Sequence, residues 1–512
     1  MDQRAKIPVS FPTTGPAPPT KSYWQDPPDE QVADYSSMRD QKSGDKLLPS
    51  EADTVIIGSG ITGASVAWGL LSASARNSKV GSEEAKGDSE DEVTEAKKQW
   101  KVVMLEARQT CSGATGRNGG HTKAASYRSF QHHVSTVGLE EAKKIATLEL
   151  NNIQKVHQFI RDERMNCEAW EGETVDVIYD QHEWESSLDG VKSMSEAFGN
   201  QKEGEYKIYE SEEAKRVFKV SDTTWEGNAE TVKGAVRYYA GSLSSYKFAV
   251  GLVKKCLERG MGLWTGTKVT ALEKGDDGLW SVKAEGGQEI KAKRVVLATN
   301  GYTAALLPSK FQGVIVPLRG QVTAQRPGSK MPKEGLDTTY SFIYDGGYEY
   351  MVTRQKGVGA RYEGDVIMGG GLVRGEKSEG GMMEFGITDD SRLNEGVSEY
   401  LRDTAVRYFG GENWGEDDGG GRVRQEWTGI MGFSPDGFPL VGEVPGEKGL
   451  WVSASFQGHG MVLCWMCAKA LVAMMDGEGD DDPNDSRLDA WFPDSFRISE
   501  ERLKKRFQGR FS

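Results

Sequence analysis

The sequence predicts an α/β fold in which a domain with a parallel sheet is interleaved with an α+β domain built on a mostly antiparallel sheet. Three observations carry this prediction. A β-branched run at residues 53–57 breaks into glycines and then an Ala- and Leu-rich helix ending near Leu71, as in a strand buried on both faces. A second apolar run, 101–106, ends on an acidic residue. Residues 311–425 mix strand-like stretches with Gly-rich turns, which is typical of antiparallel pairing.

The length of 512 residues suits two domains rather than one core. We expect the first domain to comprise residues 51–125, 234–310 and 426–478, and the second to comprise 126–233 and 311–425. Within the first, Ser244 is expected to cap a helix to about Glu258, before strands at 267–272, 280–284 and 294–298. The next sustained helical pattern is expected at about 394–409.

Two terminal segments and one insertion in the first domain are set apart from these cores. Residues 1–50 are rich in proline and polar residues, a composition that predicts an extended or partly disordered arm. Residues 72–99 are almost free of apolar side chains and are expected to form a solvated insertion. Residues 479–512 form a C-terminal tail.

Charge and cysteine content narrow the function classes. The formal net charge is −14, which disfavours nucleic acid and anionic membranes as partners. Five cysteines and a polar N-terminus favour a reducing, cytoplasmic location. The longest apolar run, 461–475, contains Lys469 and is shorter than the roughly 20 residues needed to cross a bilayer.

A glycine turn of the Rossmann type follows the first predicted strand. Gly58, Gly60 and Gly63 form G-x-G-x-x-G, which permits a tight turn, close approach of a pyrophosphate and close helix packing. Such a motif alone also arises for steric reasons. Glu106 adds a ribose acceptor, although it lies 48 residues after Gly58, beyond the roughly 20 expected. The 72–99 insertion accounts for the excess, and together these features predict dinucleotide binding.

Residues 111–121, Cys-Ser-Gly-Ala-Thr-Gly-Arg-Asn-Gly-Gly-His, resemble a segment of the D-amino-acid oxidase, glycine oxidase and sarcosine oxidase superfamily, most closely its gamma-glutamylputrescine oxidase-like branch. The resemblance implies bound FAD, with the first domain as the FAD-binding domain and the second as the substrate domain. Together with the glycine turn and the acidic strand end, it assigns these cofactor contacts: Gly58, Gly60, Ile61, Thr62, Gly63, Glu106, Ala107, Gly113, Ala114, Thr115, Arg117, Asn118, Gly119, Val269, Thr299, Asn300, Gly458, His459, Gly460 and Met461.

Several other segments carry the same resemblance. Tyr23-Trp24 is similar to an aromatic pair of that branch, and Pro317 to Gln321 resembles the crossing into the substrate domain. Gly458 to Met461 resembles the segment that returns to the flavin. We expect it to begin an apolar helix whose N–H groups face the flavin N1/O2 edge. Arg117 is expected to supply charge against phosphate.

Two departures from the family pattern concern the flavin link and the substrate. Gly429 stands where sarcosine oxidases carry a flavin-linking cysteine, and Val462 stands where they carry a lysine. FAD is therefore expected to be non-covalent, and sarcosine is a doubtful substrate.

The resemblance implies oxidation of a CH–N bond of a small amine or amino acid, with hydride transfer to flavin N5 and hydrolysis of the imine. Oxygen or another acceptor then reoxidises the flavin. A flavin monooxygenase and a non-catalytic flavin-binding protein are the alternatives.

Substrate residues are less well defined by the sequence. Arginines of the substrate domain can form a carboxylate fork, tyrosines can wall the pocket, and a histidine beside the flavin segment is a candidate base. Each also has an ordinary structural interpretation. Cys464 and Cys467 lie in an apolar helix without a second ligand pair, so packing is favoured over a metal. The candidates are His121, Arg319, Tyr344, Tyr348, Tyr350, Arg354 and Arg374.

Overall fold

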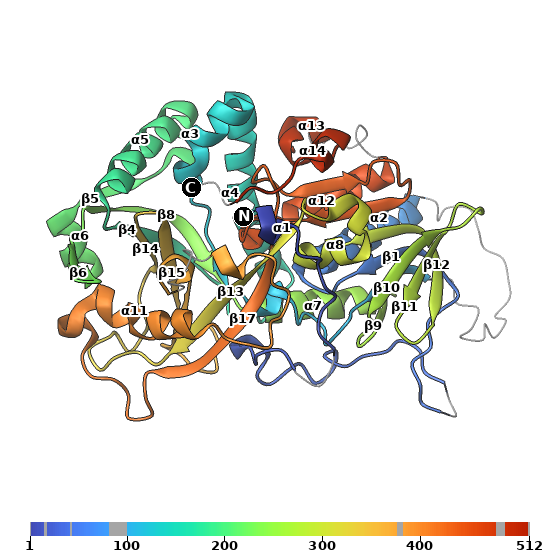
Figure 1. The fold of residues 1–512 in the computed structure, drawn as a ribbon, viewed down its shortest axis with the longest axis horizontal. Coiled ribbons are helices and arrows are strands. Elements are labelled where there is room, and N and C mark those ends of the chain that lie inside the picture. Colours follow the sequence, from blue (N-terminus) through green and yellow to red (C-terminus); the bar gives the residue numbers. More distant parts are fainter. Residues whose placement is uncertain are drawn as a thin grey trace.

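The computed structural model describes residues 2–14, 18–40, 43–80, 100–375, 382–477 and 487–509. Two sheets lie side by side, and helices cover both of them (Figure 1). One sheet is largely parallel and the other largely antiparallel. The predicted fold class is therefore confirmed.

The first sheet has eight strands and a parallel centre. Its order is β10-β11-β12-β1-β2-β9, and β19, which pairs with β18, joins it beside β12. Neighbours β12, β1, β2 and β9 are parallel, as are β12 and β19. The strands are β1 (Glu51–Ile57), β2 (Trp100–Leu105), β9 (Gly262–Trp264), β10 (Val269–Lys274), β11 (Trp280–Ala284), β12 (Glu289–Leu297), β18 (Leu440–Glu443) and β19 (Leu450–Ala454).

Helices α2 (Ile61–Val80), α7 (Ser245–Glu258) and α12 (Cys464–Asp476) pack together beside this sheet (Figure 1). Ser244 caps α7 as predicted, since its side chain accepts a bond from the Lys247 N–H. The prediction that the first helix ends near Leu71 is wrong. A polar composition excludes a buried segment but not a helix, and residues 72–80 include the strong helix formers Ala, Arg and Lys. The rest of the predicted insertion, 81–99, lies outside the described residues.

The second sheet has nine strands in the order β17-β13-β16-β15-β14-β4-β8-β3, with β5 paired to β8. Its strand pairs are antiparallel except β14 with β4. The strands are β3 (His121–Thr122), β4 (Trp170–Ile178), β5 (Lys207–Glu210), β8 (Gly234–Ser242), β13 (Val316–Gln325), β14 (Thr339–Tyr344), β15 (Gly347–Thr353), β16 (Val366–Gly369) and β17 (Val423–Phe433).

Longer helices surround the second sheet. Figure 1 shows α3 (Ser126–Val137), α4 (Leu139–Asp162) and α5 (Gln181–Phe198) at one end and α11 (Glu395–Trp414) along its other side. Asn394 caps α11 by accepting from the Val397 N–H, at the predicted start. Smaller elements are α1 (Asp2–Ala5), α6 (Ser211–Phe218), β6 (Thr223–Trp225), β7 (Asn228–Glu230), α8 (Thr303–Leu306), α9 (Pro308–Phe311), α10 (Leu372–Gly375), α13 (Leu488–Trp491) and α14 (Glu500–Lys504).

Strand pairing divides the chain a little later than the expected domain boundaries. Strands β3 and β8 and most of β17 belong to the second sheet, although their residues were expected in the first domain. The chain thus changes sheets after Ser242 and after Phe433. The extended runs at these places show no composition change that marks the crossing.

The N-terminal arm lies against the body of the protein at Ser22 and Trp24. Trp24 is only 6% exposed. Its indole Nε1 donates to Asn118 O at 2.5 Å, and Ser22 Oγ donates to Gly116 O at 2.6 Å. The arm therefore lies against the loop that the sequence assigns to the flavin.

The C-terminal tail also packs on the body. Phe492, Phe496 and Phe507 are buried. Arg502 donates from Nε and Nη2 to the two carboxylate oxygens of Asp436, at 2.9 and 2.8 Å. Both side chains are largely buried, so this ion pair fixes the tail beside the β17–β18 connection.

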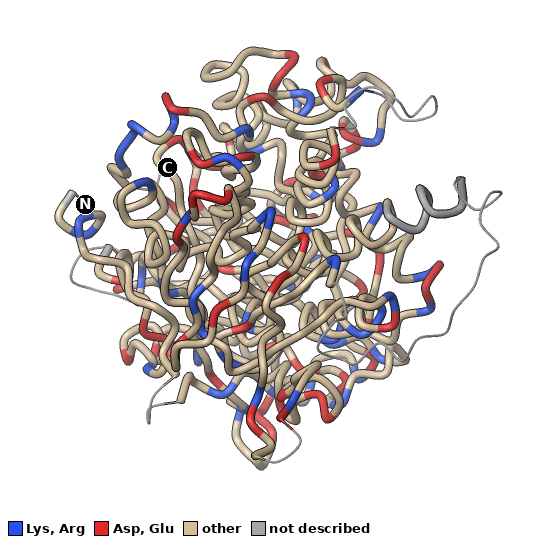
Figure 2. The backbone as a smooth tube through the Cα atoms, turned by 90° about the vertical axis from the view of Figure 1, so that its right-hand side faces the viewer, with Lys and Arg blue, Asp and Glu red and all other residues tan. Residues whose placement is uncertain are grey.

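Charged residues are spread over the molecule. Acidic and basic positions are intermixed over the backbone tube in Figure 2. Of the helices in the described ranges, none is long and apolar enough to cross a membrane.

We predict that Arg502→Met lowers the free energy of unfolding by about 3 to 5 kcal/mol, because it leaves the buried Asp436 carboxylate without its partner. Lys505→Met is the matched control, since Lys505 also reaches Asp436, at 3.4 Å, but is half-exposed. Denaturant midpoints of the two variants measure the difference. Equal midpoints would show that the tail docks through its phenylalanines alone.

Candidate active site

A cavity of about 940 Å³ runs between the two sheets. Its first end is lined by the turn after β1 and by the ends of β2 and β12. Its middle is lined by the 113–121 loop, β17 and the 456–464 segment, and its far end by α3, α4, β14 and β15. One continuous space thus joins the carboxyl edge of the parallel sheet to the antiparallel sheet.

The turn after β1 fits its backbone only with glycine at two positions. A Cβ on Gly58, which has φ +107°, would lie 2.6 Å from Ala298 O. A Cβ on Gly63 would lie 2.0 Å from Gly58 O. Helix α2 therefore begins tightly against the strand edge, and residues 58–62 line the cavity, as in a dinucleotide phosphate site.

Glu106 lies at the end of β2 on the cavity wall. Its Oε2 accepts from the Ser59 N–H and hydroxyl at 3.2 and 2.6 Å, and its Oε1 accepts from the Arg108 N–H at 2.9 Å. These bonds hold the carboxylate beside the glycine turn. With Ala107, Val269, Thr299 and Asn300 on the same walls, these residues fit the adenosine part of FAD.

The 113–121 loop forms the middle of the cavity. Thr115 Oγ1 accepts from the Ile61 N–H at 3.0 Å, which ties the loop to the start of α2. Asn118 Oδ1 accepts from the Gly120 N–H at 2.7 Å. A Cβ on Gly119 would lie 2.1 Å from the Tyr350 ring, so glycine lets this aromatic close against the loop. The small residues leave space for a flat ring system.

Arg117 differs from the expectation that it supplies charge to a phosphate. Its Nε donates to Ser112 O at 2.7 Å, and its Nη1 donates to Thr20 O and Thr428 O at 2.8 and 2.9 Å. Asp390 lies 3.7 Å from Nε. The guanidinium is thus engaged by protein oxygens, and Arg117 clamps the loop to the arm and to β17.

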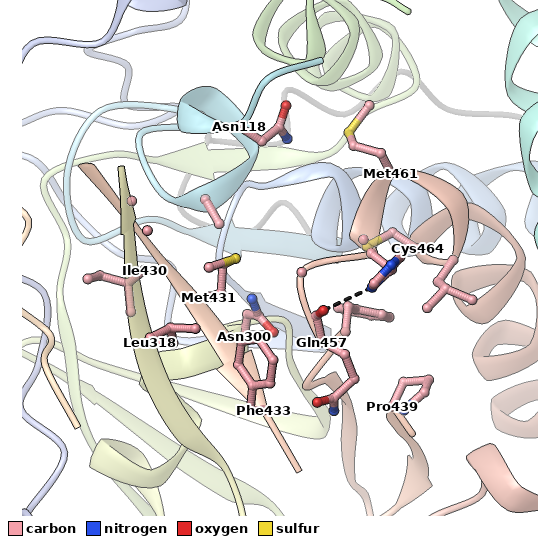
Figure 3. Close-up of a pocket in the computed structure, with 18 of the residues that line it drawn as sticks. Asn118, Asn300, Leu318, Ile430, Met431, Phe433, Pro439, Gln457, Met461 and Cys464 are labelled. Carbon is pink, nitrogen blue, oxygen red and sulfur yellow. Dashed lines mark hydrogen bonds between the residues drawn. The ribbon is translucent and has the colours of Figure 1, made fainter. Parts of the chain in front are cut away.

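The return segment is a loop rather than a helix start. Gln457 and Gly458 have left-handed φ values of +54° and +79°, and a single 3-10 turn, Gly460–Val462, precedes α12 at Cys464. The expectation that an α-helix begins at Gly458 is therefore wrong. His459 Nδ1 lies 2.9 Å from Gln457 O (Figure 3). The segment lines the cavity, as do Ile430 and Met431 of β17 (Figure 3).

The far end carries a buried polar network. Lys123 forms an ion pair with Asp176 and donates to Ser341 Oγ at 2.5 Å. Tyr127 and Tyr238 each donate to Asp176 Oδ2 at 2.8 Å. Lys123 and Ser341 line the cavity with Tyr344, Tyr348 and Tyr350. The three tyrosines that were expected to wall the pocket therefore lie on the cavity wall.

His121 lies beside this network. Its Nε2 is 2.7 Å from Thr339 Oγ1. Burial, and then the charge of Lys123, hold its pKa well below the usual value. The imidazole is therefore neutral near pH 7, which removes it as a cationic contact but leaves it lining the cavity.

Comparison with known proteins identifies the family. The model of the family described as FAD dependent oxidoreductase, DAO, matches residues 53–474. The chain belongs to this family.

Relatives of this FAD-dependent oxidoreductase are distant. A probable oxidoreductase OrdL of Haemophilus influenzae is 23% identical over 238 residues, which are 46% of this chain and 52% of that protein. The match thus spans about half of that relative. The glycine oxidase structure from Geobacillus kaustophilus has a TM-score of 0.60 at 17% identity, covering 85% of this chain and 97% of that one. L-amino acid deaminase from Proteus vulgaris has a TM-score of 0.60 at 16% identity, covering 92% and 98%. These structures share the fold.

The three arginines expected to form a carboxylate fork do not line the cavity. Arg319 pairs with Glu384 at 2.6 Å, Arg354 pairs with Glu168, and Arg374 pairs with Glu230. Arg354 also lies over Trp24, with 4.6 Å from its Cζ to the ring centroid, and Arg374 over Tyr344 at 3.4 Å. Each guanidinium is paired with a carboxylate away from the cavity, and this corrects their assignment.

The ionisable residues on the cavity wall that sequence reasoning missed include Lys123, Arg128 and Glu149. Arg128 lies 3.6 Å from Glu183 and over the Tyr348 ring. The spacing of apolar residues in α4 could have indicated Glu149, because this glutamate interrupts a buried apolar face. Lys123 and Arg128 carried no such signal, since a polar residue after a glycine loop is usual.

Cys464 and Cys467 are both buried at the start of α12. Burial raises the pKa of the Cys464 thiol to about 12. Their side chains are protonated near neutral pH, and the helix packs them against α2 and α4.

We predict that Gly63→Ala loses most of its bound FAD, because the new methyl group would lie 2.0 Å from Gly58 O and the turn must open. Gly411→Ala is the control, since a methyl group there would meet nothing within 4 Å. The ratio of flavin absorbance to protein absorbance after purification measures the loss. Full FAD content in Gly63→Ala would show that the turn is not the phosphate cradle.

Proposed function

We propose that this protein oxidises a CH–N bond of a small amine or amino acid to an imine, which water then hydrolyses. The observation that carries the proposal is the continuous cavity, which joins the glycine turn and Glu106 to the polar wall of the second sheet. The names of its fold relatives, a glycine oxidase and an L-amino acid deaminase, support this substrate class.

Bound FAD supplies the hydride acceptor, flavin N5, and oxygen or another acceptor reoxidises it. The glycine turn, Glu106, the 113–119 loop and the 458–461 segment would hold the cofactor. Tyr350 packs on Gly119 and closes one side of the space above the loop. Tyr344 and Tyr348 continue that wall toward the far end, where a small substrate is enclosed and oriented.

We also place the protein near the gamma-glutamylputrescine oxidase-like branch. The aromatic pair Tyr23-Trp24 supports this. Trp24 donates to Asn118 O in the 113–121 loop, so the pair is part of the packed structure and not of a loose arm. The free thiols of the five cysteines support a cytoplasmic location.

We predict that FAD is bound without a covalent link. Gly429, at the position of the linking cysteine, lines the cavity, and a Cβ there would already lie 3.0 Å from Arg117 Cβ. Acid precipitation should leave the yellow colour in the supernatant. Colour that stays with the pellet would contradict this, and peptide mapping would then identify the attached residue.

We predict that an amine or amino acid bleaches the flavin under anaerobic conditions without added NAD(P)H. A screen over polyamines, N-methyl amino acids and both enantiomers of amino acids tests this, with the released carbonyl compound assayed. Oxidation of NAD(P)H without any amine would favour a flavin monooxygenase. A yellow protein that no amine bleaches would favour a non-catalytic flavin-binding protein.

A further inference from the structure

Helix α4 carries three polar residues on its buried face, Glu149, Asn152 and His157, and His157 Nε2 lies 3.0 Å from Thr122 Oγ1. Ile145, Leu148, Ile153 and Val156 are buried there as a regular apolar stripe. Glu149 lies in the same stripe, with only 9% of its surface exposed, and lines the cavity. An acidic side chain in this position removes apolar burial from the helix, so a packing role does not account for it.

Asn152, one turn further on, is the second polar residue. Its Nδ2 donates to Met461 O at 3.1 Å, and its Oδ1 accepts from the Met466 N–H at 3.0 Å. It therefore fixes the return segment to α4. Residues three apart on a helix are neighbours, about 5 to 6 Å between Cβ atoms. Glu149 is thus held close to the segment that the family places at the flavin.

The Glu149 carboxyl has little to compensate its burial. Ser126 Oγ donates to Oε2 at 2.5 Å. In the described chain, burial raises its pKa to about 7 and the Ser126 bond opposes this, with no contribution from a lysine or arginine. Asp176 and Glu384, also buried, each have a cationic partner. The Glu149 carboxyl lies on the cavity wall and lacks only a cationic partner, so it is suited to bind a cationic group of a ligand.

We propose that Glu149 is a catalytic residue that binds the protonated amino group of the substrate and takes its proton. The inference rests on the proposed function and deepens it: the substrate is a primary or secondary amine that arrives as an ammonium ion. One N–H bond of the ammonium breaks, and an O–H bond forms on the Glu149 carboxyl. The freed nitrogen electron pair then forms the C=N bond as the hydride leaves the adjacent carbon. A quaternary ammonium ion has no such proton and is excluded.

Other ionisable groups lie beside α4. They include Arg128, His132 and His133 of α3, Tyr206, His459 and Cys464. Burial lowers the pKa of His133 to about 4 and raises those of Tyr206 and Cys464, the latter to about 12. These three therefore do not titrate near neutrality. His459 also lines the cavity and is the rival candidate for the proton acceptor.

The test is anaerobic flavin reduction by the amine found in the bleaching screen, followed by stopped flow across pH 6 to 10. In the parent enzyme, kred/Kd should rise with pH around 7, as the Glu149 carboxyl loses its proton. Glu149→Gln should be about a hundredfold slower near pH 8. Its rise should move toward the pKa of the free amine, about 10 for an alkylamine, because only unprotonated amine then reacts.

Two further variants sharpen the result. Ser126→Ala removes a bond that lowers the Glu149 pKa, so it should shift the rise in kred/Kd to higher pH. Glu140→Gln is the matched control, since Glu140 lies exposed on the first turn of the same helix, and its profile should match that of the parent. Flavin absorbance checks that each variant keeps its FAD.

An unchanged pH profile in Glu149→Gln would overturn the proposal, as would a rise that is abolished by His459→Gln instead. If Glu149→Gln fails to retain FAD, the Ser126→Ala profile decides, and an unshifted rise there overturns it. A parent enzyme that no amine reduces would reject the proposed function itself, before any variant is compared.

Discussion

The central loop of the molecule depends on one buried guanidinium. Arg117 donates to Ser112 O in its own loop, to Thr20 O in the arm and to Thr428 O in β17. A buried cation is costly unless its donors are satisfied, and these carbonyls come from three segments far apart in sequence. The arm, the second sheet and the loop must therefore assemble together, and the cavity acquires its shape from that assembly.

The same rule separates structural charges from functional ones. Arg319, Arg354 and Arg374 have carboxylate partners that lie away from the cavity, and Lys123 has Asp176. In each pair the two opposite charges compensate each other, so no uncompensated charge remains to bind a ligand. A carboxyl on the cavity wall with only a hydroxyl partner, as at Glu149, is the opposite case.

Local patterns predicted the elements that local chemistry determines. The glycine turn and the Ser244 cap each depend on residues within one or two turns, and these were predictable. The partners of the substrate-domain arginines were not, since Arg319 and Arg374 pair across 65 and 144 residues. The start of α12 was misplaced because Gln457 and Ser455 adopt left-handed backbone, which the non-glycine sequence does not indicate.

Glu149 shows where sequence reasoning can be extended. An amphipathic helix with a glutamate and an asparagine three residues apart on its apolar face is readable from residues 145–156 alone. The pattern predicts that two buried polar groups need hydrogen-bond partners, but only the three-dimensional fold determines which residues these partners are. Asn152 finds them in the backbone of the return segment, whereas Glu149 finds a single hydroxyl and an open cavity. Asn152 has a structural role because the protein supplies partners for both of its polar atoms. Glu149 has a chemical role because its carboxyl is left with only one partner.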